Sequence, residues 1–224
     1  MKRSEINKIM QDALEFMNEY HFALPEFAYW TPNDWKTKGH EYDEIRDNML
    51  GWDITDFGAG DFKHCGLVMF TIRNGNFSNK KYKKTYAEKL LISDDRQVTP
   101  YHFHWKKMED IINRGGGTLV IKCYNSEIDG KMLNTPVKVN MDGREYMIDA
   151  GEEVRIEVGQ SITLPMRQYH SFWSENGKTL IGEVSCVNDD TVDNRFFKKT
   201  GRFPKIEENE AILYYLGNEY PNAE

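Results

Sequence analysis

Three of the six histidines in this 224-residue chain are spaced as metal ligands would be. His102 and His104 are two residues apart, so on a β-strand both side chains point to the same face. Glu109 follows within reach across a turn, and His170 lies on a later expected strand. Imidazoles with one carboxylate suit a divalent ion such as manganese, iron, zinc, cobalt or nickel. Four protein ligands leave room for substrate oxygens on an ion that prefers six, as metal-assisted catalysis requires.

One acidic and one basic side chain fall inside apolar segments that we expect to be strands. Glu183 shares a strand face with Ile181 and Ser185, and burying a carboxylate there without a partner is costly. A functional role for Glu183 is therefore favoured over a structural one. Lys89 lies in the apolar run 87–92. Its side chain either faces the interior or extends along the outer surface with its charge in water, and the sequence leaves both open.

Four more residues are candidates for the site. Asp193 and Arg195 lie in the polar stretch that follows the strand of Glu183, where an ordinary solvated loop is the alternative. Arg167 precedes His170 by three residues and is expected to contact either the substrate or a partner subunit. Phe172 is expected to stack on a sugar or to pack in the core.

These groups form a coherent set for the isomerisation of an aldose to a ketose. The ion would chelate O1 and O2 of the open-chain sugar and polarise its carbonyl group. Glu183 would move a proton between C1 and C2 through a cis-enediol, and Lys89 or Arg195 would stabilise the developing oxyanion. The sequence does not decide between proton transfer and a hydride shift.

The spacing of the ligands resembles the two motifs of the cupin superfamily. The first motif has two histidines flanking one residue, a glutamate five residues later and then a glycine, which here is Gly116. The second has a glycine, five residues, a proline and a histidine, and it matches Gly159, Pro165 and His170. The resemblance implies a mainly β fold, the double-stranded β-helix or jelly-roll barrel, that holds one metal ion.

The chain departs from both motifs at positions that shape turns. Arg96 and Arg167 stand where glycine is usual, and Ser174 stands where the second motif usually has asparagine. None of these positions supplies a metal ligand, so the prediction of a metal site is unchanged.

The elements expected around the site are short strands preceded by a helix. The apolar period over 3–20 predicts an amphipathic helix, and 41–50 is expected to hold a short one. The aromatic-rich segment to residue 62 lacks a regular period and is expected to wrap onto a larger body. Asp142-Gly143 is a strong hairpin signal. We predict a single cupin domain over 1–224, made of an N-terminal decoration, 1–62, a barrel, 63–195, and a C-terminal segment, 196–224. The strands are expected at 66–73, 87–93, 100–105, 119–124, 137–141, 144–148, 154–158, 161–164, 170–173 and 179–187.

Composition excludes several other classes of protein. The formal net charge of -7 argues against nucleic acid as a partner. No apolar run approaches the ~20 residues of a membrane-spanning helix, and the amino terminus has no apolar secretory signal. The three cysteines are far apart and odd in number, which predicts no disulfide framework and favours a reducing cytoplasm.

Four stretches of the chain resemble the D-lyxose ketol-isomerase family of cupins, over nearly the whole length. The resemblance implies a homodimer that uses manganese to interconvert D-lyxose with D-xylulose, and often D-mannose with D-fructose. It assigns the metal to His102, His104, Glu109 and His170, and the catalytic carboxylate to Glu183, with Lys89 and Arg195 as further candidates. The stretches are 87–93 (AEKLLIS), 102–117 (HFHWKKMEDIINRGGG), 182–190 (GEVSCVNDD) and 193–196 (DNRF).

Two other classes of cupin remain as alternatives. One is another enzyme, either an iron dioxygenase or a phosphosugar isomerase, for which the basic run 80–84 would have to bind the phosphate. The other is a non-catalytic sugar-binding cupin, which needs no base. In all of these readings the expected partner is a small molecule.

Overall fold

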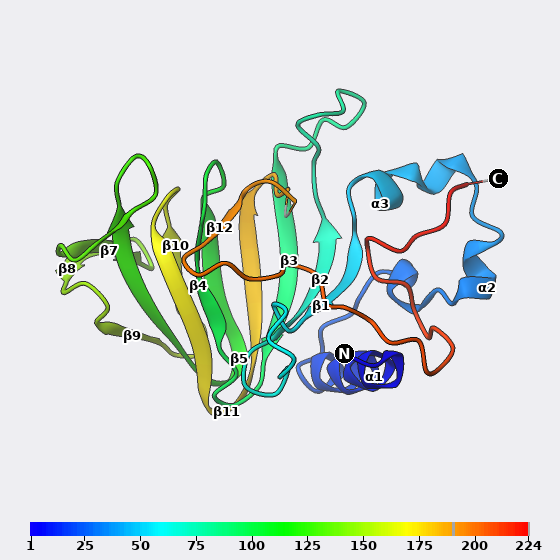
Figure 1. Ribbon diagram of the computed structural model, residues 1–224, viewed down its shortest axis with the longest axis horizontal. Coiled ribbons are helices and arrows are strands. Elements are labelled where there is room, and N and C mark those ends of the chain that lie inside the picture. Colours follow the sequence, from blue (N-terminus) through cyan, green and yellow to red (C-terminus); the bar gives the residue numbers. More distant parts are fainter. Residues whose placement is uncertain (190, 224) are drawn as a thin grey trace.

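A computed structural model describes residues 1–189 and 191–223, and most of its regular structure is antiparallel β-sheet. The helices come first, as expected, and the strands follow (Figure 1). The helical elements are α1 (Arg3–Glu19), η1 (Glu26–Tyr29), α2 (Pro32–Trp35), η2 (His40–Tyr42) and α3 (Asp43–Asp47). The strands are β1 (Gly51–Thr55), β2 (Leu67–Arg73), β3 (Tyr86–Ser93), β4 (Thr99–His104), β5 (Glu109–Ser126), β6 (Met132–Leu133), β7 (Val137–Met141), β8 (Arg144–Ile148), β9 (Glu153–Ile156), β10 (Ser161–Leu164), β11 (Tyr169–Cys186) and β12 (Asn194–Phe196).

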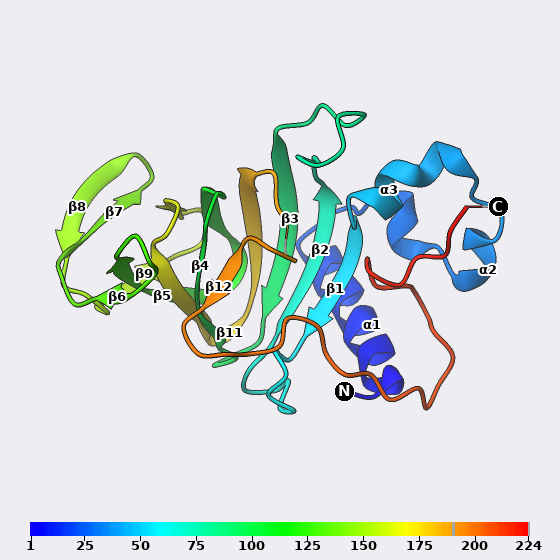
Figure 2. The same ribbon diagram turned by 45° about the horizontal axis from the view of Figure 1, so that its top comes forward.

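The predicted N-terminal helix packs on the outside of the sheet. The apolar side of α1 is buried against strands β1 to β3, and Figure 2 shows the helix lying along them. Its Arg3 is 1% exposed and forms ion pairs with Glu208 and Glu219, which ties the helix to the C-terminal segment. The apolar residues of this outer cluster include Ile6, Met10, Ala13, Met17, Trp52, Val68 and Phe70.

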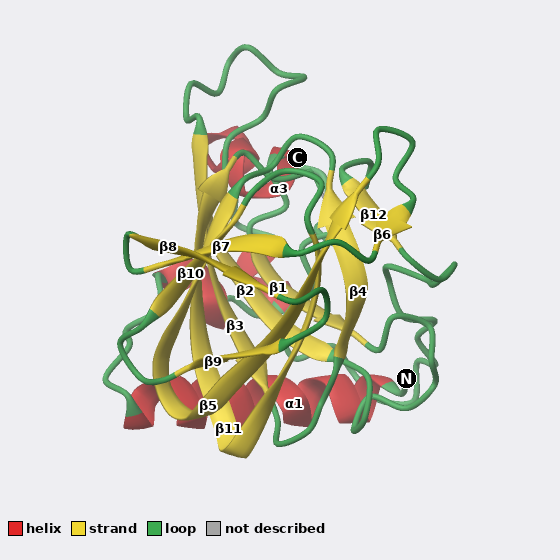
Figure 3. Cartoon of the chain, turned by 90° about the vertical axis from the view of Figure 1, so that its left-hand side faces the viewer, coloured by secondary structure: helices red, strands yellow, loops and turns green. Residues whose placement is uncertain are grey.

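Two long strands, β5 and β11, join the walls of the barrel. They pair with each other along most of their 18 residues. In the sheet, β11 is followed on its other side by β3, β2 and β1. On the other side of β5 the neighbours are β10, β7 and β8 in turn. Strand β4 pairs with β11 and β12, and β9 pairs with β5. The sheet therefore curves around a common interior, with α1 outside it (Figure 3).

An irregularity in β11 changes which residues face the interior. The register against β5 shifts between Glu175 and Thr179 and again between Leu180 and Ile181. Before it, His170 and Phe172 are buried inside the barrel; after it, Ile181 and Glu183 are buried there. The interior residues have even numbers before the irregularity and odd numbers after it. Between Glu175 and Ile181, β11 therefore has a net one residue more than the paired part of β5. The alternation predicted for 179–187 is confirmed, although 170–173 and 179–187 are parts of one strand.

The hairpin predicted at Asp142-Gly143 joins β7 to β8. Both turn residues have positive φ, +48° and +81°, which is the backbone of the tight turns that Asp-Gly favours. Three strands were not predicted: β1, within the segment expected to wrap onto the barrel, pairs with β2; the two-residue β6 pairs with β5; and the short β12 pairs with β4. The three cysteines are free thiols, as expected, and no helix in the described part of the chain is long and apolar enough to cross a bilayer.

Candidate active site

The four residues predicted to bind a metal come together inside the barrel. His102 and His104 lie on β4, Glu109 begins β5 and His170 lies near the start of β11. One nitrogen from each of the three imidazoles lies within 4.8 Å of the others. An oxygen of Glu109 is 3.4 Å from His104 Nε2 and 3.3 Å from His170 Nε2. All four side chains are buried. Residues from β4, β5 and β11 therefore meet at one place inside the barrel.

Backbone carbonyl groups orient two of the imidazoles. His102 Nδ1 is 2.8 Å from the Pro100 oxygen, and His170 Nδ1 is 3.1 Å from the Gln168 oxygen. Because a carbonyl oxygen only accepts, these Nδ1 atoms carry the hydrogen and the Nε2 lone pairs are available to an ion. His104 Nδ1 is buried without a hydrogen-bond partner among the described residues. Three imidazoles and one carboxylate fit a divalent transition ion.

The ionisation of these groups also suits a metal. Burial lowers the pKa of His170 to about 4, with Glu109 opposing the change, and lowers the pKa of His102 well below its ordinary value, reinforced by the other two imidazoles. Burial alone would raise the pKa of Glu109, but Lys107 and then His104 outweigh it and hold that pKa well below the usual range. At neutral pH the imidazoles of His102 and His170 are therefore neutral and the carboxylate is charged, which are the forms that bind a cation.

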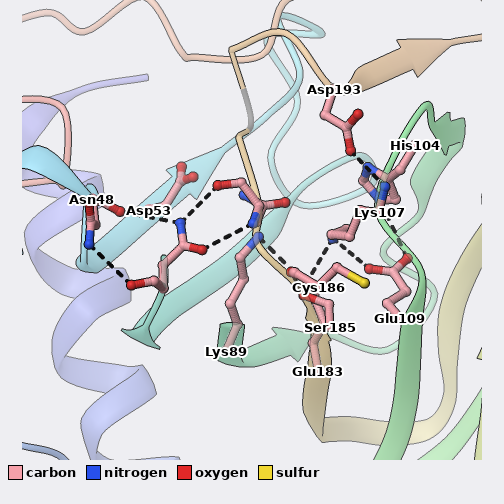
Figure 4. Close-up of polar contacts among 12 residues, drawn as sticks. Asn48, Asp53, Lys89, His104, Lys107, Glu109, Glu183, Ser185, Cys186 and Asp193 are labelled. Carbon is pink, nitrogen blue, oxygen red and sulfur yellow. Dashed lines mark hydrogen bonds and ion pairs between the residues drawn. The ribbon is translucent and has the colours of Figure 1, made fainter. Parts of the chain in front are cut away.

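A buried lysine that was not predicted from the sequence links the expected metal ligand Glu109 to the expected base Glu183. Lys107 Nζ is 2.6 Å from Glu109 Oε2 and 2.8 Å from Glu183 Oε1 (Figure 4). All three side chains are at most 5% exposed. Lys107 precedes Glu109 by two residues, so in an extended chain both point the same way. Lys107 itself lies in the turn between β4 and β5, however, so this parity alone does not give the direction of its side chain.

Lys89 faces the interior, so the alternative of an outward-pointing side chain is wrong. It lies opposite Glu183 in the register of β3 and β11, and its Nζ is 3.7 Å from Glu183 Oε1. Glu183 thus has two lysines beside it, and the Ser185 hydroxyl donates a hydrogen bond to it at 3.3 Å.

Asp193 binds the backbone of the turn that carries Lys107. Its two carboxylate oxygens accept hydrogen bonds from the amides of Lys106 at 2.9 Å and Lys107 at 3.1 Å (Figure 4). Its own carbonyl oxygen accepts from the Trp105 amide at 3.0 Å. Three bonds to consecutive residues fix the chain between His104 and Glu109. The alternative of a solvated loop fails at Asp193, which is buried.

We expect Asp193→Ala to weaken metal binding by about 10- to 100-fold, because outer partners of metal sites have effects of that size. The measurement is the dissociation constant of the divalent ion. Asp189→Ala is the matched control, since in the described contacts the Asp189 carboxylate bonds only to Thr191 of its own loop. A raised KM for sugar with unchanged metal affinity would instead make Asp193 a direct substrate contact.

Arg195 is not brought to the interior. The alternation of β12 turns Asn194 and Phe196 towards the cavity, and Arg195 points outward, where its Nε donates to the Tyr169 hydroxyl at 3.2 Å. Arg195 therefore lies outside the cavity that contains the four expected ligands. Asp190, which ends one of the stretches that carries the family resemblance, lies outside the described residues.

Arg167 also lies outside the cavity, with its guanidinium 5.0 Å from the centre of the Trp105 ring. Its φ is +65°, and Arg96, the other arginine at a usual glycine position, has φ +60°. Both keep the left-handed turn that glycine adopts without strain, at a cost of roughly 1–2 kcal/mol each. The departures from the cupin motifs thus preserve the turns.

The reactive side chains line a cavity of about 430 Å³, a volume that includes its open mouth. Phe172 lines it, together with the four expected ligands and with Lys89, Lys107 and Glu183. Thr99 lines it as well, and its buried hydroxyl has no hydrogen-bond partner among the described residues. Arg202, from the C-terminal segment, completes one wall. No periodic pattern in the sequence marked Arg202.

Comparison with solved structures identifies the barrel as a cupin fold. L-ribose isomerase of Cellulomonas parahominis, with L-psicose, matches with a TM-score of 0.61 at 15% identity, covering 92% of this chain and 98% of that one. L-ribose isomerase of Acinetobacter sp. DL28, in complex with L-ribose, gives the same TM-score, identity and coverage. At this identity the similarity shows the fold alone, and it confirms the predicted fold class.

Sequence comparison is more specific. The D-lyxose/D-mannose isomerase of Serratia proteamaculans is 44% identical over 223 residues, and that of Escherichia coli O157:H7 is 43% identical over 223 residues. Each match covers 98% of both chains. The model of the D-lyxose isomerase family matches residues 1–220. This chain, matched along almost its whole length, belongs to the D-lyxose isomerase family.

Proposed function

We propose that this family member is a metal-dependent isomerase that interconverts D-lyxose with D-xylulose and D-mannose with D-fructose. The observation that carries the proposal is the placement of Glu183 in the same buried cavity as the imidazole cluster, joined to Glu109 through Lys107. A sugar-binding protein without catalysis has no need to bury a carboxylate and two lysines beside a metal site, because each buried charge costs free energy.

The residues present fit a divalent ion held by His102, His104, Glu109 and His170. When bound, such an ion supplies Lewis-acid polarisation of a sugar carbonyl group. We propose manganese, since the mixed nitrogen and oxygen donors admit it. We also propose a homodimer in the cytoplasm, in keeping with the family resemblance.

Glu183 is the base in this proposal. Its carboxylate removes the proton from C2 of the open-chain aldose, which leaves a cis-enediol, and returns that proton to C1. The hydroxyl hydrogen on O2 moves to O1 in the same conversion, so C1 becomes a CH₂OH group and C2 a carbonyl group. No atom is gained or lost overall. The same carboxylate serves both steps because C1 and C2 are adjacent on one face of the intermediate.

The two lysines stabilise negative charge that develops on the sugar oxygens. Lys107 and Lys89 lie within 3.7 Å of Glu183, so a substrate placed against the carboxylate is within reach of both ammonium groups. Donors that are held in place before the reaction stabilise an oxyanion without reorganising. Lys107 takes the part that the sequence analysis gave to Arg195.

The test is a screen of unmodified pentoses and hexoses with added manganese, read by sugar chromatography. We expect conversion of D-lyxose and D-mannose, and loss of that conversion after treatment with a chelator. Activity that requires oxygen and iron would indicate a dioxygenase, and conversion of phosphorylated sugars alone would indicate a phosphosugar isomerase. Binding of sugar with no product would favour the non-catalytic alternative.

A further inference from the structure

The chain that follows β12 crosses the barrel and places one cation in the cavity. We call residues 197–204 the strap. Figure 1 shows it, in orange, passing from β12 across β3 and β2 to β1. The strap is attached by backbone and hydroxyl bonds: the Phe197 amide donates to Tyr101, the Gly201 amide and the Thr200 hydroxyl donate to the Phe57 carbonyl, and the Thr55 hydroxyl donates to the Arg202 carbonyl.

The side chain of Arg202 is held by Asp53 of β1. Its Nη1 donates to one carboxylate oxygen at 3.2 Å and its Nη2 donates to the other. The Arg202 side chain is 12% exposed and that of Asp53 is 20% exposed. A bidentate contact of this kind fixes the plane of the guanidinium group as well as its position. Arg202 therefore lines the cavity as a pre-oriented donor of hydrogen bonds.

The anchor of Arg202 lies on the side of the cavity away from the metal ligands. Across the sheet the order of strands is β1, β2, β3 and β11, and the ligands lie on β4, β5 and β11. Three steps of ~4.8 Å separate β1 from β11, or roughly 14 Å. Phe57 and Phe196 line the same cavity with their ring centres 5.7 Å apart. Arg202 thus reaches the cavity from the wall that contains β1, three strands away from the strand that carries His170.

We propose that Arg202 binds the O6 hydroxyl, which only the six-carbon sugar carries, and so makes the enzyme accept six-carbon as well as five-carbon aldoses. This inference rests on the proposed function. D-lyxose and D-mannose have the same configuration from C2 to C4 and differ only beyond C4. Any group that distinguishes them must therefore lie at the end of the sugar that is remote from C1 and C2. A guanidinium suits that position, because sugar hydroxyls accept its hydrogen bonds.

The experiment compares kcat/KM for D-mannose and D-lyxose in the wild-type enzyme and in Arg202→Met, both loaded with manganese. We expect the ratio of mannose to lyxose to fall by about tenfold or more, through a higher KM for the hexose, because a site that loses a hydrogen-bond donor to one substrate discriminates against that substrate. Lys199→Met is the matched control, since Lys199 is an exposed cation of the same strap, and its ratio is expected to equal that of the wild type.

Two further variants keep the test valid if Arg202→Met does not fold. Arg202→Lys retains the charge beside Asp53 but loses the planar fork, and Asp53→Asn leaves Arg202 in place with a weaker anchor. Both are expected to lower the ratio in the same direction by a smaller factor. Equal losses for the two sugars, or an unchanged ratio in folded Arg202 variants, would overturn the inference alone. A wild-type enzyme that converts neither sugar would overturn the proposed function.

Discussion

Replacing Glu183 by glutamine is expected to lower kcat by about 10³- to 10⁴-fold, which is the upper range for the loss of a general base. Glutamine keeps the size of the side chain but cannot take a proton from C2. The metal ligands are untouched, so the metal content is expected to stay at the wild-type level. Steady-state kinetics with D-lyxose and elemental analysis of the purified variant measure the two quantities.

The matched control for Glu183→Gln is Glu88→Gln. Glu88 lies on β3 beside Lys89, but its side chain faces outward and pairs with Arg73, so its loss is expected to leave kcat unchanged. Running the wild-type reaction in heavy water adds an independent readout, because transfer through Glu183 exposes the proton to exchange and places deuterium at C1 or C2. Full turnover by Glu183→Gln would remove this residue from the mechanism, and product without deuterium would favour a hydride shift.

Replacing His170 by glutamine is expected to weaken binding of the divalent ion by more than about 100-fold, since even the outer partners of a ligand alter affinity by up to that factor. His170 Nε2 lies at the centre of the cluster, 3.3 Å from Glu109. Turnover at low manganese is expected to fall to the level of the chelated enzyme. Titration of metal-free protein with manganese, followed by activity, measures the change.

His64→Gln provides the comparison for the His170 variant. His64 is 70% exposed and contacts Asp61 on the surface, so its substitution tests the loss of an imidazole without the loss of a ligand. Wild-type affinity for manganese in His170→Gln would exclude this imidazole from the metal site.

The cluster of His102, His104 and His170 was predictable from the sequence because the direction of each side chain follows from short-range spacing. His102 and His104 share a strand face by parity, and the glycine and proline spacing of the second motif positions His170. Glu183 was predictable for the same reason, since alternation with Ile181 gives its face. In each case side chains alternate between the two faces of a β-strand, so the spacing between two residues shows whether they point to the same face.

The sequence misses residues in strands that are too short to show an alternation, and residues whose contacts are with partners far away in the sequence. Strand β12 has three residues, which are too few to show that Arg195 points outward. Arg202 lies in a strap without a period, and its partner Asp53 is 149 residues away. Lys107 lies in a turn whose shape depends on bonds to Asp193, 86 residues later. Such contacts depend on the tertiary fold, so one sequence without its structure does not identify them.

The net extra residue in β11 makes the length of the segment 175–181 a chemical parameter. His170 and Glu183 are separated by an odd number of positions, yet both face the same interior, and only the irregularity between them allows this. Substitutions in that segment leave the parity intact. Loss of one residue would turn Glu183 and its neighbours out to solvent while the imidazoles stayed in place. The protein would then keep its affinity for the ion and lose its proton acceptor, so a single insertion or deletion in this segment separates metal binding from turnover.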